Sequence, residues 1–329
     1  MRFRYLLAIE SSCDDSGIAI LDENGIVQVD ALCSFKDYSL KLGGIVPEIA
    51  ARHHIAIMSS LLESVLAKSH FSSKYIDVIA VTHRPGIIGS LLVGVSFAKG
   101  LSSALNIPLL GINHIEGHLF CGYGESNFVL PPFIGVIVSG GHSSIYLCDE
   151  KYNLKMIGDT KDDAAGEILD KVGRMLGLRY PAGKMIDYLA KHGVENNKIK
   201  FPNMTQEALD YSFSGLKTAV GCMLDFAERT QERFILSDFC FEFQRHIMRE
   251  VLNKAKIACK AYGISKLVFG GGVVANSFLR QELSNLSDLS VYIPLLKDCT
   301  DNAIMIGKAA VLKLRTGKEI SEDFFVFSH

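Results

Sequence analysis

Two histidines stand four residues apart in the segment NHIEGHLF, at residues 113–120. If this segment is helical, His114 and His118 lie one above the other on one face, a spacing that suits two imidazoles on one metal ion. Glu116 follows two residues after His114 and would point away from that ion, unlike the glutamate of the zinc-protease motif. Because such a pair is more often ordinary helix packing, other residues must decide between the two interpretations.

A carboxylate in the second half of the chain could supply a third ligand. Asp301 stands in CTDNA (299–303), at the entry of the last expected helix, as His114 does in the first half. An N-cap at that helix is the alternative role. Two imidazoles and one carboxylate would leave coordination positions open for a substrate. We therefore expect a metal site of His114, His118 and Asp301, with the histidines from one lobe and the carboxylate from the other.

Three turns could bind an anionic ligand. SSCDDS places Asp14 between two strands, where an acid can hold a hydrated metal or a substrate amine, or simply form the turn. In VSGGHSS, Gly140 and Gly141 would let the backbone approach a ligand, although a plain hairpin is the alternative. GGGVVAN follows a strand and opens a helix, which aims free amides at an anion, and its Asn276 could bind a base or ribose. It lacks the lysine of a Walker A loop.

The segment DDAAGEILDKVGRMLGLRYPAGKMID, at residues 162–187, predicts a close-packed helix followed by a turn. Asp170 is a possible ligand contact, and Gly183 lies in the turn with Asp187 one helical turn further on. A solvated acidic face is an equal alternative. The chain has no GxSxG, no HExxH and no Cys/His pair of recognisable spacing, so no side-chain nucleophile is indicated.

The composition is that of a globular protein. The chain has 329 residues, of which 48% are hydrophobic and 21% charged, which excludes a disordered or fibrous class. The net charge of −2 gives no global attraction to nucleic acid, so a polyanion must meet a local basic patch or be held jointly with another protein. Eight cysteines without a CxxC pair indicate reduced thiols. The longest apolar run, IIGSLLVGVSFA, is about a dozen residues, too short for a bilayer, and we expect a soluble cytoplasmic protein.

The two halves of the chain share one pattern. YLLAIE–SSCDDS–GIAIL near the start matches FIGVIV–SGGHS–SIYLC from residue 133, and each half continues with a strand, a Gly turn and a helix. Such alternation predicts parallel-sheet α/β units, here as two similar lobes facing each other across a cleft. We assign residues 1–125 to an N-terminal lobe and 126–329 to a C-terminal lobe. The latter carries a helical insert at about 160–262, with an amphipathic run at about 236–261.

Nine segments in register make the chain resemble the bacterial TsaD family over its whole length: IESSCDDSGIAIL, GGIVPEIAARHH, PGIIGSLLVG, NHIEGH, VSGGHSS, DDAAGEILDKVGRMLGL, FSGLKTAV, FGGGVVANSFLR and CTDNAIMIG. The resemblance implies the two-lobed actin/sugar-kinase/Hsp70-like α/β fold, with internal duplication and a cleft between the lobes. It also implies an acyltransferase that moves a threonylcarbamoyl group from threonylcarbamoyl-adenylate to N6 of adenosine 37, in tRNAs that read codons beginning with A, and releases AMP.

The resemblance further implies residue roles. The family's metal ligands fall on His114, His118 and Asp301, which would hold one divalent ion per subunit, Fe²⁺ before Zn²⁺, although these ligand types accept several metals. The acid needed for activity falls on Asp14. Nucleotide and substrate contacts fall on Ile137, Val138, Ser139, Gly140, Gly141, Asp170, Gly183, Asp187 and Asn276. The implied partners are tRNA, a TsaB-like paralogue and a TsaE-like ATPase, without a membrane.

Some residues depart from the family pattern. His83 and Arg84 precede Pro85 where the family usually has Ala-Gly, and His53 replaces an acid. We expect them to affect tRNA or partner contacts and not the metal ligands. Two other classes stay open, since older members were named as O-sialoglycoprotein endopeptidases: a metallopeptidase, and a sugar kinase or non-catalytic nucleotide-binding module of the same fold. The position of Glu116 argues against a metallopeptidase. The three expected metal ligands argue against a non-catalytic binding module.

Overall fold

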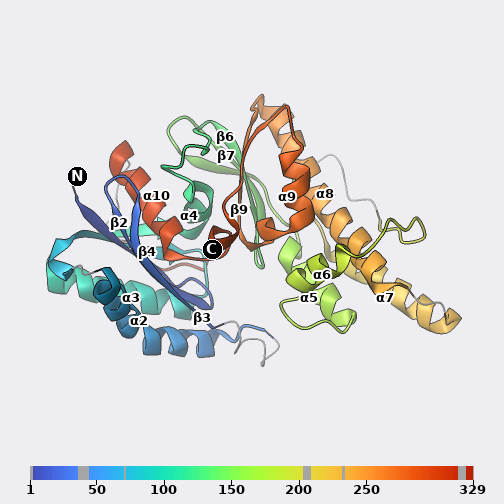
Figure 1. The fold of residues 1–329 in the computed structure, drawn as a ribbon, viewed down its shortest axis with the longest axis horizontal. Coiled ribbons are helices and arrows are strands. Elements are labelled where there is room, and N and C mark those ends of the chain that lie inside the picture. The colour runs from blue at the N-terminus through green and yellow to red at the C-terminus, as the bar shows by residue number, and fades with distance from the viewer. Residues whose placement is uncertain are drawn as a thin grey trace. The chain divides into compact units, whose positions relative to one another are not determined.

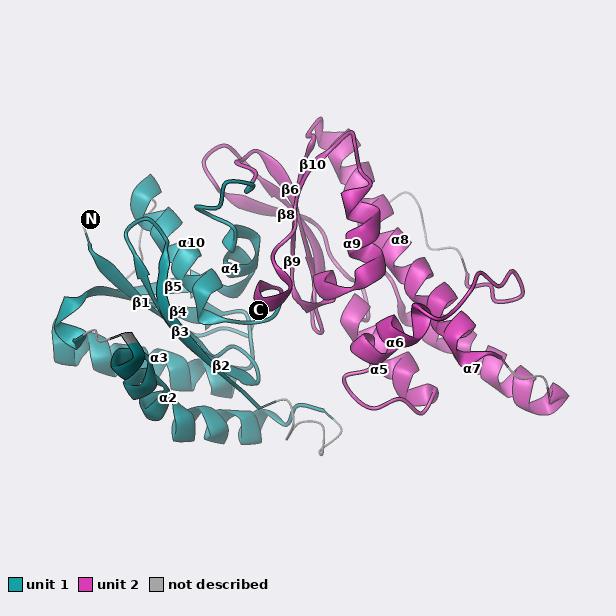
Figure 2. Ribbon diagram, viewed as in Figure 1, with its two compact units in different colours: residues 1–128, 300–329 teal, residues 129–299 magenta. Residues whose placement is uncertain are grey.

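The computed structural model describes residues 3–35, 44–69, 72–202, 209–231, 234–317 and 324–328. The chain divides into two compact units (Figure 2). Unit 1 comprises Met1–Phe128 and Thr300–His329, and unit 2 comprises Val129–Cys299. Each unit is built on one five-stranded sheet.

The sheet of unit 1 has the order β3-β2-β1-β4-β5. β1 pairs antiparallel with β2 and parallel with β4, and β4 pairs parallel with β5. The central strand β1 is almost wholly apolar and buried, whereas β3 alternates half-buried and exposed residues as expected of an edge strand. The strands are β1 (Tyr5–Glu10), β2 (Asp15–Asp22), β3 (Val27–Ser34), β4 (Ile76–Arg84) and β5 (Leu109–Asn113).

Helices cover both faces of this sheet (Figure 1). α2 and α3 pack on one face, and α10 packs on the other together with α4. α10 is delimited by local signals, since the Asn302 side chain caps its start and Gly317 ends it in the left-handed conformation. The helices are α2 (Pro47–Ser69), α3 (Ile88–Leu105), α4 (His114–Phe120), α10 (Ala303–Thr316) and the 3₁₀ turn η1 (Ser73–Tyr75).

The sheet of unit 2 has the order β10-β9-β6-β7-β8. β6 is buried at every position, and it pairs antiparallel with β7 and parallel with β9. The strands are β6 (Phe133–Val138), β7 (Ser143–Cys148), β8 (Leu154–Gly158), β9 (Lys266–Gly270) and β10 (Ser290–Tyr292).

Five α-helices are described in unit 2, and the long α8 packs against β6, β9, α6 and α9. Its apolar side chains form the core of the unit, and Gly263 ends it in the left-handed conformation. The elements are α5 (Ala165–Met175), α6 (Gly183–Ala190), α7 (Ser214–Thr230), α8 (Leu236–Tyr262), α9 (Ser277–Ser284), η2 (Gly272–Ala275) and η3 (Leu296–Asp298). α8 matches the amphipathic helix expected at about 236–261.

The internal duplication expected from the sequence is present in the sheets. Read from β3 to β5 and from β8 to β10, both sheets have the same strand order. In both, the first two pairings are antiparallel and the last two are parallel. The helices between β8 and β9 have no counterpart of similar size among the described residues of unit 1, and they fall in the expected insert at about 160–262.

The division of the chain differs from two consecutive lobes at 1–125 and 126–329. Residues 300–329 belong to unit 1, because α10 packs against β1 and β2. Asp301 is therefore in the same unit as His114 and His118, and not in a different lobe from them as the sequence pattern suggested.

α3 is the one helix in the described ranges whose length and composition would let it cross a membrane. It is longer than the dozen-residue apolar run counted in the sequence. It packs between α2 and β4, and its buried side chains include Leu91, Val95 and Ala98. Core helices of soluble proteins share these properties, so they do not by themselves indicate a membrane span.

Candidate metal and nucleotide sites

His114 and His118 lie on α4, as the sequence predicted. The Asn113 side chain caps the helix by accepting a hydrogen bond from Ile115 N at 2.8 Å, so the helix begins at His114. Both histidines are buried, at 6% and 1% exposure. Their rings meet edge to face with centroids 4.7 Å apart.

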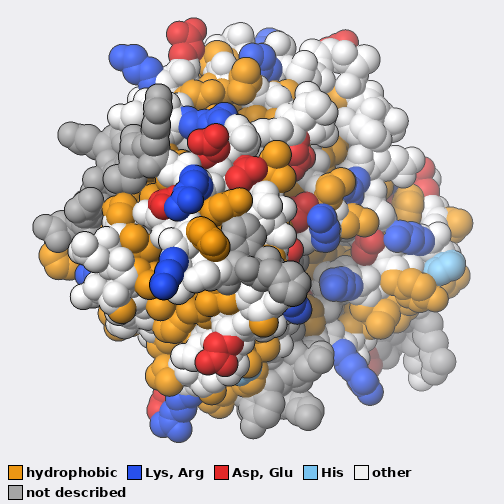
Figure 3. Space-filling model, turned by 60° about the vertical axis from the view of Figure 1, so that its left-hand side comes forward, with side chains coloured by type: hydrophobic (Ala, Val, Ile, Leu, Met, Phe, Trp, Pro, Cys, Tyr) orange, Lys and Arg blue, Asp and Glu red, His pale blue; other side chains and the backbone are white. Residues whose placement is uncertain are grey.

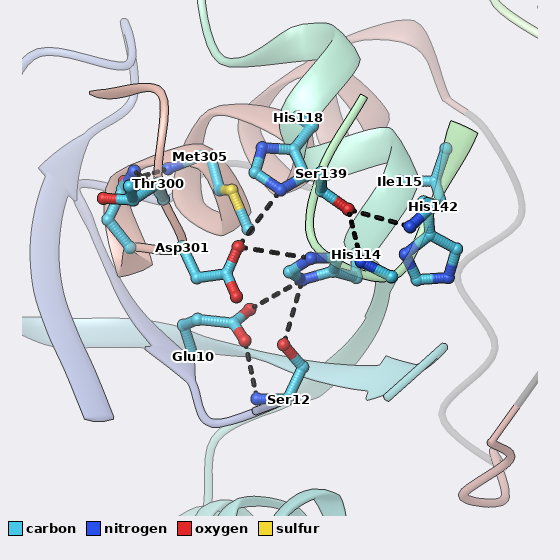
Figure 4. A network of polar contacts seen from close by, with 12 residues as sticks. Glu10, Ser12, His114, Ile115, His118, Ser139, His142, Thr300, Asp301 and Met305 are labelled. Carbon is cyan, nitrogen blue, oxygen red and sulfur yellow. Dashed lines mark hydrogen bonds and ion pairs between the residues drawn. The ribbon is translucent and has the colours of Figure 1, made fainter. Parts of the chain in front are cut away.

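Asp301 precedes Asn302, the N-cap of α10, and faces both histidines (Figure 4). Its Oδ1 is 3.4 Å from His114 Nε2 and 3.2 Å from His118 Nε2. The cap of α10 is made by Asn302, whose side chain accepts a hydrogen bond from Met305 N at 3.0 Å. An N-cap role therefore does not explain Asp301.

The three side chains fit a metal ion by chemistry and by geometry. Each offers one ligand atom, and these atoms all lie within 4.8 Å of one another. Two imidazole nitrogens and one carboxylate oxygen form a donor set that binds divalent transition metals. The group is thus a buried set of side chains that could hold a metal ion, and it is contained within unit 1.

A glycine allows α4 and α10 to approach closely enough for this arrangement. A Cβ atom at Gly117 would lie 2.9 Å from Ile306 Cδ1 and 3.2 Å from Met305 Cγ. A larger residue at position 117 would therefore have to displace these two side chains at the start of α10. The glycine of the HIEGH motif therefore has a packing reason.

Behind His114 lies a polar network that the sequence analysis missed. Glu10, at the end of β1, is fully buried, and its Oε2 lies 3.5 Å from His114 Nδ1. Ser12 Oγ lies 3.1 Å from the same nitrogen. Glu10 also accepts hydrogen bonds from Ser12 N, at 2.6 Å, and from the Thr82 hydroxyl. Groups of this kind orient a ligating imidazole through its second nitrogen.

The pKa values of the two histidines are shifted in opposite directions. Burial disfavours the charged form of His114, but Asp301 and Glu10 outweigh burial and raise its pKa to about 9. For His118, burial dominates and lowers the pKa despite its hydrogen bond to Asp301. Without a metal, the cluster therefore holds one imidazolium and one neutral imidazole. A metal ion would take the place of the proton on His114.

Glu116 points away from this cluster, as predicted. Its carboxylate pairs with Lys313 Nζ of α10 at 2.5 Å. A metallopeptidase of the zinc-protease type needs a glutamate beside the metal to hold the attacking water, and Glu116 is committed elsewhere.

Asp14 lies in the turn between β1 and β2 and is 6% exposed. Burial raises the pKa of the neighbouring Cys13 thiol well above its usual value, and Asp301 and Asp14 raise it further. Both carboxylates therefore act electrostatically on Cys13, in the turn that also carries Ser12.

The departures from the family pattern make contacts inside unit 1. His83 Nδ1 lies 3.0 Å from the carbonyl oxygen of Phe325, and its ring meets Phe324 edge to face at 5.0 Å. His53 stacks on Phe35 with ring centroids 4.1 Å apart.

In unit 2, the SGG turn joins β6 to β7. Ile137 and Val138 are buried at the end of β6, and Ser139 Oγ accepts hydrogen bonds from the amides of Gly141 and His142, at 3.3 and 3.0 Å. A Cβ at Gly140 or Gly141 would meet nothing within 4 Å, so these glycines border open space.

The start of α5 packs directly on this turn. Gly166 N donates to Ser139 O at 3.1 Å, and a Cβ at Gly166 would lie 2.5 Å from that oxygen. Asp170, one turn further along α5, accepts a hydrogen bond from Ala182 N at 2.6 Å, immediately before Gly183. Burial raises the pKa of Asp170, although the backbone amides favour its charged form.

α6 links these residues to the Gly-rich turn after β9. Asp187 Oδ1 accepts hydrogen bonds from Ser277 N, at 3.1 Å, and Ser277 Oγ, at 2.7 Å. The neighbouring Asn276 caps α9 by accepting from Leu279 N, at 3.0 Å, and donates to Gln244 Oε1, at 2.8 Å. The expected nucleotide residues of unit 2 are therefore connected by successive contacts, with Asn276 already bonded through both ends of its amide.

Comparison with solved structures agrees with the expected fold class. HypF from T. kodakarensis aligns with 96% of the chain and 48% of that protein, with a TM-score of 0.63 and 13% identity. The (R)-2-hydroxyglutaryl-CoA dehydratase component A from Acidaminococcus fermentans aligns with 96% of the chain and 100% of that protein, at a TM-score of 0.57 and 16% identity. At these identities the similarity shows the fold alone, and it confirms the actin/sugar-kinase/Hsp70-like class.

Comparison with known sequences is more specific. The model of the family described as TsaD, tRNA N6-adenosine threonylcarbamoyltransferase, matches residues 29–308. The tRNA N6-adenosine threonylcarbamoyltransferase of Thermosipho africanus is 43% identical over 323 residues, covering 97% of the chain and 96% of that protein. That of Clostridium botulinum is 40% identical over 323 residues, covering 97% and 95%. The chain therefore belongs to the TsaD family of tRNA N6-adenosine threonylcarbamoyltransferases, the enzymes that form N6-threonylcarbamoyladenosine in tRNA.

Proposed function

We propose that the chain transfers a threonylcarbamoyl group from threonylcarbamoyl-adenylate to N6 of adenosine 37 in tRNAs that read codons beginning with A. The reaction releases AMP and depends on the cluster of His114, His118 and Asp301. The observation that carries the site assignment is the meeting of two buried Nε2 atoms and one carboxylate oxygen in unit 1. Membership of the TsaD family supplies the reaction class and tRNA as the substrate.

His114, His118 and Asp301 would hold one divalent metal ion. Two histidines and one carboxylate suit Fe²⁺ with open coordination positions, and Zn²⁺ accepts the same ligands, so we propose Fe²⁺ first. When bound, such an ion supplies Lewis acidity and a template for phosphate or carbamoyl oxygens. Glu10 and Ser12 hold the His114 ring through Nδ1, so that its Nε2 stays directed at the cluster.

The adenylate is assigned to unit 2. The backbone of Ile137, Val138 and Ser139 leads into Gly140 and Gly141, where open space beside the glycines leaves room for a phosphate or ribose. Asp170 of α5 and Gly183 at the start of α6, together with Asp187 and Asn276, would form the rest of the nucleotide pocket. Because Asn276 is bonded at both ends of its amide, its role is to position the turn after β9.

The substrate arrives as an activated mixed anhydride, so the protein needs no nucleophile of its own. The chain's task is to position the anhydride and remove a proton from the attacking amine. Asp14 is the candidate acceptor for that proton, because it is a buried carboxylate in the turn that carries Ser12.

The proposal includes helpers and a compartment. We assign a TsaB-like paralogue and a TsaE-like ATPase as partners, since a chain of net charge −2 has no global attraction for tRNA. None of the eight cysteines forms a disulfide, which fits the reducing cytoplasm.

The experiment supplies purified chain and helpers with undermodified tRNA and threonylcarbamoyl-adenylate, and analyses nucleosides by mass spectrometry. Wild type should form N6-threonylcarbamoyladenosine, and Asp301→Ala should lose both the product and bound metal. Full activity and metal content in Asp301→Ala would refute the site assignment. Product absent with wild type, but present with a known enzyme set on the same tRNA, would refute the reaction. Cleavage of a glycoprotein by the same preparation would instead favour the peptidase.

A further inference from the structure

The outer side of α8 carries positive charge that the proposed reaction does not use. α8 buries one side in the core of unit 2, while Arg249, Lys256 and Lys260 are exposed on the other. With Arg245 they stand at successive spacings of four, seven and four residues, which keeps them on one side of the helix. From Arg245 to Lys260 this side is about 22 Å long, at 1.5 Å per residue.

Two adjoining hollows follow this side of the helix. The larger has a volume of 730 Å³ and is lined by Lys200, Arg249 and Lys256 among others. The second, of 490 Å³, is lined by Lys256 and Lys260 near the end of α8. Lys256 borders both, so the two hollows adjoin along α8. We call Lys200, Arg249, Lys256 and Lys260 the α8 basic face.

The acids of the larger hollow are already neutralised. Glu242 pairs with Arg245 at 3.2 Å, and Glu250 pairs with Lys254 at 3.5 Å. Within the described ranges no ion pair involves a residue of the α8 basic face. The remaining charge of the larger hollow is therefore cationic. One acid, Asp288, borders the second hollow beside Lys260.

This concentration of charge differs from the mixed surface of the view in Figure 3. There, Lys and Arg side chains (blue) are interspersed with Asp and Glu side chains (red) among the described residues. On a chain of net charge −2, a local excess of cations attracts a polyanion to that place. A row of cations about 16 Å long, from Arg249 to Lys260 at 1.5 Å per residue, suits more than one phosphate of a chain better than a single free nucleotide.

We propose that the α8 basic face binds the phosphate backbone of the substrate tRNA. This rests on the proposed function for the identity of the polyanion, and adds a tRNA contact remote in sequence from the metal ligands. Phosphate contacts fix the orientation of a nucleic acid and carry no base specificity. The α8 basic face would therefore orient the tRNA without selecting its sequence.

The test compares two double charge reversals in the full chain. Arg249→Glu/Lys256→Glu alters the α8 basic face, and Lys151→Glu/Lys155→Glu is the matched control, since all four side chains are exposed in unit 2. The affinity for undermodified tRNA is measured by fluorescence anisotropy at several salt concentrations. The Arg249→Glu/Lys256→Glu variant should bind about tenfold more weakly than the control, and its salt slope should be smaller by about 2. Its KM for tRNA should rise while metal content and melting temperature match the control.

Equal tRNA affinity and salt slope in the two variants would overturn the proposal. So would a loss of AMP or inorganic phosphate binding with unchanged tRNA binding, which would make the groove a small-anion site. Failure of this proposal can be distinguished from failure of the proposed function. Wild type that binds tRNA through this face yet forms no N6-threonylcarbamoyladenosine would refute the reaction alone, and product formation with equal affinities would refute the α8 contact alone.

Discussion

Glu10→Gln tests whether the buried carboxylate behind His114 sets the metal affinity of the cluster. Glutamine has nearly the same shape and keeps one oxygen to accept from Ser12 N, but it removes the negative charge 3.5 Å from His114 Nδ1. The variant should therefore fold with its cluster in place and hold a metal ion more weakly. No metal ligand is changed.

The expected loss follows from what remains around His114. Removing an outer carboxylate of this kind costs 10–100-fold in metal affinity, or roughly 1.4–2.7 kcal/mol. Two features put this variant at the lower end. Ser12 Oγ, 3.1 Å from Nδ1, still holds the ring. Glu10 also helps raise the pKa of His114 to about 9, so its removal lessens the competition from protons at pH 7. We expect a loss of about tenfold.

The assay is calorimetric titration of metal-stripped protein with Zn²⁺ at pH 7, repeated anaerobically with Fe²⁺. Ser90→Ala is the control, because the Ser90 hydroxyl is buried without a hydrogen-bond partner in the described residues and does not touch the cluster. It should bind metal as wild type does. Melting temperatures of the metal-free variants separate a general loss of stability from a loss of affinity. An affinity of Glu10→Gln equal to wild type would refute the orienting role of Glu10.

Three further variants test other parts of the structure. Gly166→Ala should weaken AMP binding by equilibrium dialysis and leave metal content unchanged, because its Cβ would lie 2.5 Å from Ser139 O and displace the SGG turn; unchanged AMP binding would remove this turn from the nucleotide site. Asp162→Ala should lower the free energy of unfolding by about 1 kcal/mol in urea at pH 7, since Asp162 accepts hydrogen bonds from the first amides of α7. Burial acts to raise the pKa of Asp162, but bonds such as that from Ser212 hold it at about 2, so the difference should be complete above about pH 4 and shrink toward pH 2. Glu116→Gln should keep full transferase activity and lose less than about 1 kcal/mol of stability, because a partly exposed ion pair contributes little. Loss of activity with metal retained would show that Glu116 takes part in the reaction.

Much of the fold is local in origin and could be predicted. β1 and β6 are short apolar runs followed by polar turns, and the long α8 has an apolar side at helical spacing that ends at a glycine. The repetition of the same order in both halves predicted two similar sheets. The membership of Asp301 in unit 1 could not be predicted from this pattern, because it depends on α10 returning across the chain to pack on β1 and β2.

The three side chains of the candidate metal cluster could be predicted, but the groups that support them could not. His114 and His118 signal themselves by spacing, whereas Glu10 reaches His114 across more than a hundred residues of chain. A weak signal was present, since Glu10 ends an otherwise apolar strand and a buried carboxylate needs partners. Similarly, the hydrogen bonds of the Asn276 side-chain amide with Leu279 N and Gln244 Oε1 could not be predicted from the sequence. They depend on the packing of α8 against α9.

The duplicated sheets explain why the two candidate sites arise where they do. In unit 1, the parallel strands β1 and β5 end at Glu10 and immediately before His114, so their carboxyl ends bring these side chains to one edge. In unit 2, the parallel strands β6 and β9 end at the SGG turn and at the Gly-rich turn, at the equivalent edge. The carboxyl edge of parallel strands is the place where α/β sheets bind ligands. The two copies differ in what they place there: imidazoles and carboxylates in one, glycines and backbone amides in the other. The same topology thus places side chains that could hold a metal ion at this edge in unit 1, and glycines and backbone amides suited to phosphate at the equivalent edge in unit 2.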